Sequence, residues 1–200
     1  MTKFISFLFL LITPSLYAQE KILILGDSLT EGHNLNEEDS FPSQLQDILN
    51  KEYRKKKFKV INGGVSGSTT ASGLSRLKWF MKAKPKVMVL ALGANDGLRG
   101  IKLEGSEKNL EKIISTAQAN KIIVVIAGMR IPPNYGENYT KKFQELYIKL
   151  AKKFKIKRIP FLLKDVAGKK ELNLADGIHP NKQGYTIVAK NVFTVLKEVL

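Results

Sequence analysis

Short apolar runs alternate with amphipathic segments along almost the whole chain. The runs are rich in Ile, Val and Leu and occupy residues 21–25, 58–61, 87–92, 121–127 and, more weakly, 158–163. Unbroken runs of this kind are typical of strands buried on both faces of a parallel sheet. The segments between them repeat apolar residues at spacings of three and four, as helices with one buried face do, over residues 41–51, 71–82, 107–119, 138–154 and 182–200. The pattern predicts a doubly wound, three-layer α/β/α sandwich with a five-stranded parallel sheet.

The composition fits such a fold and excludes several kinds of chemistry. A chain of 200 residues has the length of one domain and can bury a substantial core. It contains no Cys, which excludes disulfides, thiolate nucleophiles and zinc–sulfur or iron–sulfur centres. With two His in the chain, any catalytic imidazole must belong to His33 or His179.

The N-terminal residues 1–18 have the features of a signal peptide. Lys3 precedes a mostly apolar run over residues 4–12, and Ala18 offers a small residue at the cleavage point. The run is shorter than the about 20 residues that a membrane-spanning helix needs. We therefore expect cleavage near Ala18, a single domain over residues 19–200, and a location in the periplasm or the medium. An uncleaved N-terminal anchor is the alternative.

The chain is strongly basic, with 33 Lys and Arg against 18 Asp and Glu and a net charge of +15. Such a charge favours nucleic acid, anionic lipid or anionic substrates as partners. The lysines are spread along the chain, and no nucleic-acid-binding motif accompanies them. We expect a solvated, Lys-rich surface and no nucleic-acid partner, with transient contact with an anionic membrane surface as the alternative. The oligomeric state stays open.

Polar, glycine-rich segments follow each of the five predicted strands, at residues 26–30, 62–70, 93–97, 127–136 and 176–181. Right-handed crossovers place all strand-to-helix loops on one edge of a parallel sheet. Ligands of doubly wound folds bind at that edge. We therefore expect these five segments to surround one crevice.

The residues in these loops can carry out acyl transfer. Ser28 follows the first strand, and a serine needs a neighbouring base to become a nucleophile. His179 lies in a loop on the same edge, and Asp176, three residues earlier, is placed to hold its imidazole. The backbone N–H groups of Ser28 and Gly67 and the side-chain amide of Asn95 can supply three donors to a developing oxyanion.

Each of these residues, taken alone, also fits a structural role, because Ser, Gly and Asn commonly cap helices or form turns. His179 alone also fits a surface position. We interpret His33 as a residue of the surface or the pocket rim, since no carboxylate lies at a comparable spacing. Asp27 and Asp96 are expected to shape their loops through turns or hydrogen bonds. The joint placement of the parts on one edge favours the catalytic interpretation.

Four sequence blocks resemble those of the GDSL, or SGNH, hydrolases. They are GDSLTEG with Ser28, GVSGSTT with Gly67, LGANDGLRG with Asn95 and DGIHPN with His179, in the order and with the rough spacing of that family. The resemblance runs from residue 22 to about residue 189. It is strongest to the bacterial periplasmic branch with thioesterase, arylesterase and lysophospholipase activities, whose mobile loop and pocket wall are similar to residues 97–100 and 130–136.

The resemblance implies the SGNH hydrolase fold with its flavodoxin-like, five-stranded parallel sheet. It implies Ser28 as nucleophile, His179 as base and Asp176 as its partner, with Ser28, Gly67 and Asn95 forming the oxyanion hole. It further implies neither a metal nor an organic cofactor. The implied substrates are small-molecule or lipid esters: acyl thioesters, lysophospholipids, and aryl or short-chain esters.

The sequence departs from the family at two positions. Ser68 stands where many relatives have an acidic residue, and Ala94 where close relatives often have glycine. The first change affects how the loop of Gly67 is held, and the second predicts a slightly stiffer turn before Asn95. Neither change predicts a loss of activity.

Three other functions remain open from the sequence. A carbohydrate acetylesterase would use the same scaffold and the same Ser28 chemistry. A metal-dependent phosphohydrolase would use the carboxylates of Asp27, Asp96 and Asp176 with His179 as ligands. A non-catalytic binding module is the third, since a fold does not fix a function.

Overall fold

The computed structural model describes residues 19–200 and has the predicted three-layer α/β/α architecture. The strands are β1 (Glu20–Gly26), β2 (Phe58–Gly64), β3 (Val87–Ala91), β4 (Ile123–Ala127) and β5 (Lys157–Ile159). They form one parallel sheet in the order β2-β1-β3-β4-β5, which is the order of flavodoxin-like folds. The predicted fold class is confirmed, and the predicted signal peptide lies outside the described residues.

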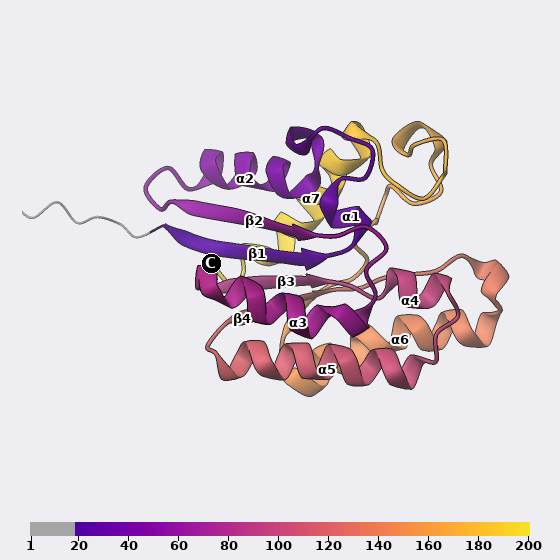
Figure 1. Ribbon diagram of the computed structural model, residues 1–200. Helices are drawn as coiled ribbons and strands as arrows, with labels where there is room; N and C mark the ends of the chain where they lie inside the picture. The colour runs from indigo at the N-terminus through magenta and orange to yellow at the C-terminus, as the bar shows by residue number, and fades with distance from the viewer. Residues whose placement is uncertain (1–18) are drawn as a thin grey trace, which may run out of the picture.

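Helices cover both faces of the sheet, as Figure 1 shows. One face carries α2 (Phe41–Glu52) and α7 (Lys182–Leu196), which pack against each other. The other carries α3 (Thr70–Phe80), α5 (Leu103–Ala119) and α6 (Glu137–Phe154). Within residues 19–200, none of the helices has the length and apolar character needed to cross a membrane.

The hydrophobic pattern explains why these segments take these forms. Residues 22–25 of β1 and all of β3 are buried, as expected of central strands with helices on both sides. The helices contribute single apolar faces, such as Leu45 and Leu49 of α2 and Leu110 and Ile114 of α5. The layers therefore meet in one continuous apolar core.

The fifth strand is shorter than expected, which corrects the prediction for residues 158–163. β5 ends at Ile159, and Pro160 follows. Proline has no N–H to donate to a neighbouring strand, so the ladder stops there. The chain then turns back toward β4, where the N–H of Leu162 donates to the carbonyl of Gly128.

Other boundaries also differ from the sequence prediction. β4 begins at Ile123 rather than at residue 121, because Lys121 has a left-handed backbone with φ of 60°. α5 starts at Leu103 rather than residue 107, and α7 ends at Leu196 rather than residue 200. Several short helices were not predicted: α1 (Ser28–Glu31), α4 (Ala94–Leu98) and the 3-10 turns Glu37–Asp39, Met81–Ala83, Pro133–Tyr135 and Lys170–Leu172.

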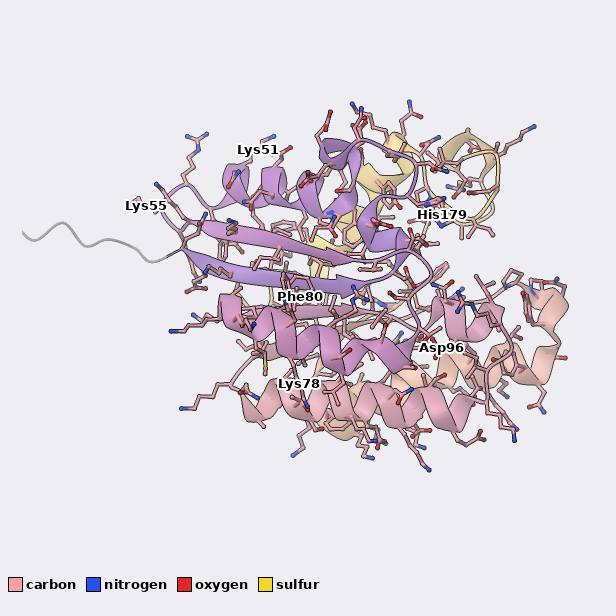
Figure 2. All side chains as sticks on the ribbon, viewed as in Figure 1. Lys51, Lys55, Lys78, Phe80, Asp96 and His179 are labelled. Atoms are coloured by element: carbon pink, nitrogen blue, oxygen red, sulfur yellow. The ribbon has the colours of Figure 1, made fainter. Side chains whose placement is uncertain are left out.

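The strand register brings the predicted site segments to one edge. Gly26 at the end of β1 lies level with Gly64 of β2 and Ala91 of β3. The short helices α1 and α4 begin directly beyond this edge, and His179 and Asp96 lie at the same end of the molecule (Figure 2). The expectation of one shared edge is met.

Candidate active site

Ser28, His179 and Asp176 form a continuous chain of hydrogen bonds. The hydroxyl of Ser28 lies 2.9 Å from Nε2 of His179. On the other side of the ring, Nδ1 of His179 lies 2.8 Å from Oδ2 of Asp176. With the ring proton on Nδ1, the imidazole donates to the carboxylate and Nε2 is free to accept from the serine. Sequence reasoning named all three residues, and the structure brings them together.

Ser28 is held by the tight turn between β1 and α1. Asp27 caps α1, and its Oδ1 accepts from the N–H of Leu29 at 3.0 Å. Ser28 is the first residue of the helix, so its own N–H has no partner within the helix. The turn is closely packed: a Cβ on Gly26 would lie 1.9 Å from the hydroxyl of Thr30.

The loop before α7 fixes Asp176 relative to His179. Oδ1 of Asp176 accepts from the backbone N–H groups of Ile178 and His179 at 2.9 and 3.0 Å. Partial burial acts to raise the pKa of Asp176, but these bonds and the imidazole outweigh it and lower the pKa to about 2. The carboxylate of Asp176 is therefore charged at neutral pH.

Gly67 and Asn95 lie beside Ser28, as predicted. The three residues line one cavity. Gly67 has φ of 74°, a conformation that glycine adopts without strain. Nδ2 of Asn95 donates to the carbonyl of Ser68 at 3.0 Å, which leaves its second amide hydrogen for a ligand.

Arg99 supports the Gly67 loop, and sequence reasoning did not assign it this role. Its guanidinium donates to the carbonyl of Gly67 at 3.0 Å. Together with the bond from Asn95 to the carbonyl of Ser68, this contact holds the Gly67 loop in place. Residues 97–100 stand out in the sequence through their similarity to a loop of the related family, but this similarity does not predict the contact between Arg99 and Gly67.

Asp96 joins three elements behind the crevice. Its buried carboxylate accepts from the N–H and hydroxyl of Thr70 at 2.9 and 2.6 Å and from the hydroxyl of Ser106 at 2.9 Å. It thereby ties the starts of α3 and α5 to α4. The expectation that Asp96 shapes its loop is confirmed, and the Ser106 contact explains why α5 starts earlier than its apolar pattern predicts.

Asp27 is the second buried carboxylate at this edge. Burial raises its pKa to about 6, although the N–H of Leu29 and the charges of His179 and Arg76 act in the opposite direction. Within residues 19–200, its Oδ2 has no hydrogen-bond partner. The role expected from the sequence, shaping the loop, is the one it has as the cap of α1.

His33 lies at the rim of the crevice, as expected, but in a richer setting than the sequence indicated. Its ring centroid is 4.6 Å from that of His179. The hydroxyl of Ser66 lies 3.4 Å from Nδ1 of His33 and donates to the carboxylate of Glu31. Ser66 thus links the carboxylate of Glu31 to the ring of His33, and the spacing of these residues in the sequence does not predict this link.

Two neighbouring cavities lie at this edge of the sheet. The smaller, of about 240 Å³, is lined by Ser28, Gly67, Asn95 and His179. The larger, of about 530 Å³, is mainly apolar and includes Met129, Ile131, Phe161 and Leu163. They share the side chains of Leu29, Ala94, Leu98 and Ile178. The two cavities therefore meet at these side chains.

The carboxylates at the crevice are not arranged as metal ligands. Asp27 caps α1, Asp96 accepts from Thr70 and Ser106, and Asp176 accepts from His179 and its loop. Across residues 19–200, no three His, Asp or Glu side chains gather as a group that could hold a metal. The hydrogen bonds from Ser28 through His179 to Asp176 instead have the geometry that proton transfer from a serine hydroxyl requires.

Comparisons with known proteins agree with this geometry. The model of the GDSL-like Lipase/Acylhydrolase family matches residues 24–187. The chain is 39% identical to an arylesterase of Vibrio mimicus over 92% of both chains. It is 36% identical to the thioesterase 1/protease 1/lysophospholipase L1 of Escherichia coli strain K12, over 92% of this chain and 86% of that protein.

The fold comparison gives the same result. The crystal structure of TesA superposes with a TM-score of 0.86 and 34% sequence identity, covering 90% of this chain and all of that one. The resemblance inferred from the four blocks is thus confirmed. The chain belongs to the GDSL-like lipase/acylhydrolase family, and its enzyme class is that of hydrolases acting on carboxylic ester bonds.

Proposed function

We propose that the protein hydrolyses carboxylic esters and thioesters through an acyl-enzyme on Ser28. The observation that carries this proposal is the hydrogen-bond chain from Ser28 through His179 to Asp176. Oγ of Ser28 attacks the acyl carbonyl while Nε2 of His179 takes its proton. Asp176 keeps the ring in the tautomer that can accept this proton and stabilises the imidazolium.

The tetrahedral intermediate carries its negative charge on the former carbonyl oxygen. The N–H groups of Ser28 and Gly67 and the amide of Asn95 donate to it. The bond to the leaving alcohol or thiol then breaks, and His179 returns the proton to the leaving group. A water molecule, deprotonated by His179, repeats the sequence on the acyl-enzyme and releases the acid and free Ser28.

The larger cavity supports an acyl chain as the group that is bound. Its lining is mainly aliphatic and aromatic, and it continues from the Ser28 cavity through Leu29 and Leu98. At its wall, the guanidinium of Arg130 lies 4.8 Å from the ring centroid of Phe161 and offers a positive charge to an anionic head group. These features favour acyl thioesters, lysophospholipids and aryl or short-chain esters as substrates.

We also propose that residues 1–18 direct export and are removed, leaving a domain that starts at Gln19. The charged start at Lys3, the apolar run at 4–12 and the small residue Ala18 support this proposal. Mass spectrometry of the protein recovered from the periplasm or medium of a producing bacterium tests it. A mass beginning at Gln19 is expected, and an intact chain in the membrane fraction would contradict it.

A substrate panel tests the proposed activity and separates it from sugar deacetylation on the same scaffold. Purified protein is assayed with p-nitrophenyl esters of increasing chain length, an acyl thioester, a lysophospholipid and acetylated sugars. We expect turnover of acyl substrates, with KM falling as the chain fills the apolar cavity. Turnover restricted to acetylated sugars would contradict the acyl-substrate proposal. The Leu98→Asp variant, which places a charge where the two cavities meet, should raise KM for longer chains more than for acetate esters.

A further inference from the structure

The edge of the sheet opposite the crevice is strongly basic. The four connections that lead from a helix to the next strand span residues 53–57, 81–86, 120–122 and 155–156. They contain nine Lys or Arg and no Asp or Glu. The five segments that lead from a strand to the next long helix, at the crevice edge, contain six Lys or Arg against nine Asp or Glu. The net charge of +15 is therefore unevenly distributed along the axis of the strands. The loops at the edge opposite the crevice are strongly positive, and those at the crevice edge carry an excess of acidic residues.

Most of this charge is free to meet a partner. Eight of the nine side chains are exposed and the ninth, Lys56, is half-buried. Among residues 19–200, ion pairs engage two of the nine, since Lys56 and Lys86 both contact Glu20. Lys55 lies at one end of the molecule and His179 at the other (Figure 2). The remaining cations form a positive surface that faces away from the crevice.

The same edge also has apolar and positional features that suit a lipid surface. A hollow of about 470 Å³ is lined by the exposed Ile123 and by other aliphatic side chains, together with Lys121 and Lys155. Lys157 also lines it and is paired with Glu198. β1 begins at this edge with Glu20. The described chain therefore enters the fold at its basic side.

We propose that this basic edge, defined by residues 53–57, 81–86, 120–122 and 155–156, is a docking surface for a bilayer that contains anionic lipid. Phosphate head groups complement the unpaired cations, and lysines near a lipid surface can keep their charges at the head groups over apolar side chains. Basic residues outside this edge, such as Lys108 of α5 and Lys141 of α6, point from helices and contribute less to contact.

Docking in this way fixes where substrates enter. β1 has seven residues and, at about 3.3 Å per residue, separates the two edges by about 23 Å. The crevice of a docked molecule then opens toward the aqueous phase and away from the bilayer. This second part rests on the proposed function: the docked enzyme takes its ester from solution, not from the membrane that holds it.

Vesicle binding tests the surface independently of catalysis. Protein of residues 19–200 is sedimented with vesicles of ether-linked phosphatidylcholine, with or without ether-linked phosphatidylglycerol, which carry no ester bond to hydrolyse. We expect binding to phosphatidylglycerol vesicles at about 0.01 M salt and its loss at about 1 M, where the Debye length falls from about 30 to about 3 Å. Absence of binding at low salt would overturn the proposal.

Two triple variants of equal charge locate the contact. Arg54→Gln, Lys55→Gln and Lys57→Gln remove three exposed cations from the basic edge. Lys108→Gln, Lys141→Gln and Lys142→Gln remove three exposed cations from the outer faces of α5 and α6. We expect the edge variant to bind the phosphatidylglycerol vesicles at least about tenfold more weakly than the unmodified protein. The affinity of the control variant should change by less than about twofold. Equal weakening by both would show attraction by net charge alone and contradict a docking edge.

Activity of the bound enzyme tests its orientation. A water-soluble acetate ester is hydrolysed with and without saturating phosphatidylglycerol vesicles. Retention of the rate supports a crevice that faces away from the lipid, whereas a large loss on binding means that the crevice faces the bilayer and contradicts the orientation. A protein that binds vesicles but hydrolyses no ester without them would overturn the proposed function and leave the docking surface standing.

Discussion

At the scale of single residues, the site depends on which of two neighbouring imidazoles contacts the serine. The rings of His33 and His179 lie 4.6 Å apart. His179 alone joins Ser28 to Asp176 by bonds of 2.9 and 2.8 Å. His33 is linked instead to Ser66 and, through it, to Glu31. Both histidines therefore lie at the crevice, but of the two only His179 has the hydrogen bonds that a general base needs.

The two histidines should therefore respond differently to replacement. His179→Ala removes the proton acceptor and should lower kcat by about a thousandfold or more. His33→Ala removes a ring at the rim and should lower it by less than about tenfold, because no proton passes through it. Steady-state kinetics with a p-nitrophenyl ester measures both. Equal losses in the two variants would contradict the assignment of His179 as the base.

Asn95 provides a second test at this scale, since we propose that its amide donates to the oxyanion of the transition state. Asn95→Ala should lower kcat by about a hundredfold to a thousandfold, the usual cost of one oxyanion donor, with little change in KM. The loss of its bond to the carbonyl of Ser68 also loosens the loop. Arg99→Ala, which removes the other bond that holds this loop and leaves the Asn95 amide in place, is the matched control and should lower kcat much less. A rise in KM with unchanged kcat would instead assign Asn95 to substrate binding.

At the scale of elements, short helices at the ends of strands hold the reacting groups. α1 presents the N–H of Ser28, and α4 presents Asn95 behind Gly93. Gly93 has φ of 113°, and a Cβ there would lie 2.2 Å from the hydroxyl of the buried Tyr147, so only glycine fits without displacement. Asp27 and Asp96 anchor these two turns as buried carboxylates. The positions of both turns therefore depend on buried carboxyl side chains close to the site.

The cap of α1 should make stability depend on pH. The pKa of Asp27 is about 6 in the folded protein against an ordinary 3.8, so the folded state holds this proton more tightly. The stabilisation is complete below about pH 4 and is lost as pH rises through about 6, a change of up to about 3 kcal/mol. Asp27→Asn keeps an oxygen acceptor for Leu29 and cannot ionise.

Urea unfolding at about pH 4 and about pH 8 measures this effect. The free energy of unfolding of Asp27→Asn minus that of the unmodified protein should be higher at pH 8 than at pH 4 by about 1 to 3 kcal/mol, because only the unmodified protein loses stability as Asp27 ionises. The subtraction removes the contributions of other groups that titrate alike in both proteins. A difference that does not vary with pH would contradict the raised pKa of Asp27.

At the scale of the whole molecule, hydrophobic periodicity was sufficient to predict the architecture. Buried strands such as β1 and β3 stand out because helices cover both of their faces, and topology rules then bring their loops to one edge. The short β5 was overestimated because the apolar residues after Pro160 pack in the core without pairing as a strand. Periodicity reports burial and does not by itself report hydrogen bonding between strands.

For the candidate site, the sequence predicts the main residues but not the contacts that hold them in place. Ser28, Gly67, Asn95, Asp176 and His179 were predicted because their chemistry and blocks coincide at one edge. The supporting contacts were not. Arg99 on the carbonyl of Gly67 and Glu31 on Ser66 connect residues more than thirty positions apart, and their geometry is set only when the loops fold. The opposite charges of the two sheet edges likewise emerge only from the three-dimensional arrangement.

The central claim is that Ser28 is the nucleophile of a metal-independent ester hydrolase. Its most direct test is labelling of protein of residues 19–200 with a fluorophosphonate probe in the presence of EDTA, followed by peptide mass spectrometry, with folded Ser28→Ala beside it. We predict a single adduct on the peptide of Ser28, loss of ester turnover in proportion to labelling, and no adduct in the variant. A folded protein that hydrolyses esters yet carries no adduct at Ser28, or whose Ser28→Ala variant keeps its turnover, would contradict the account.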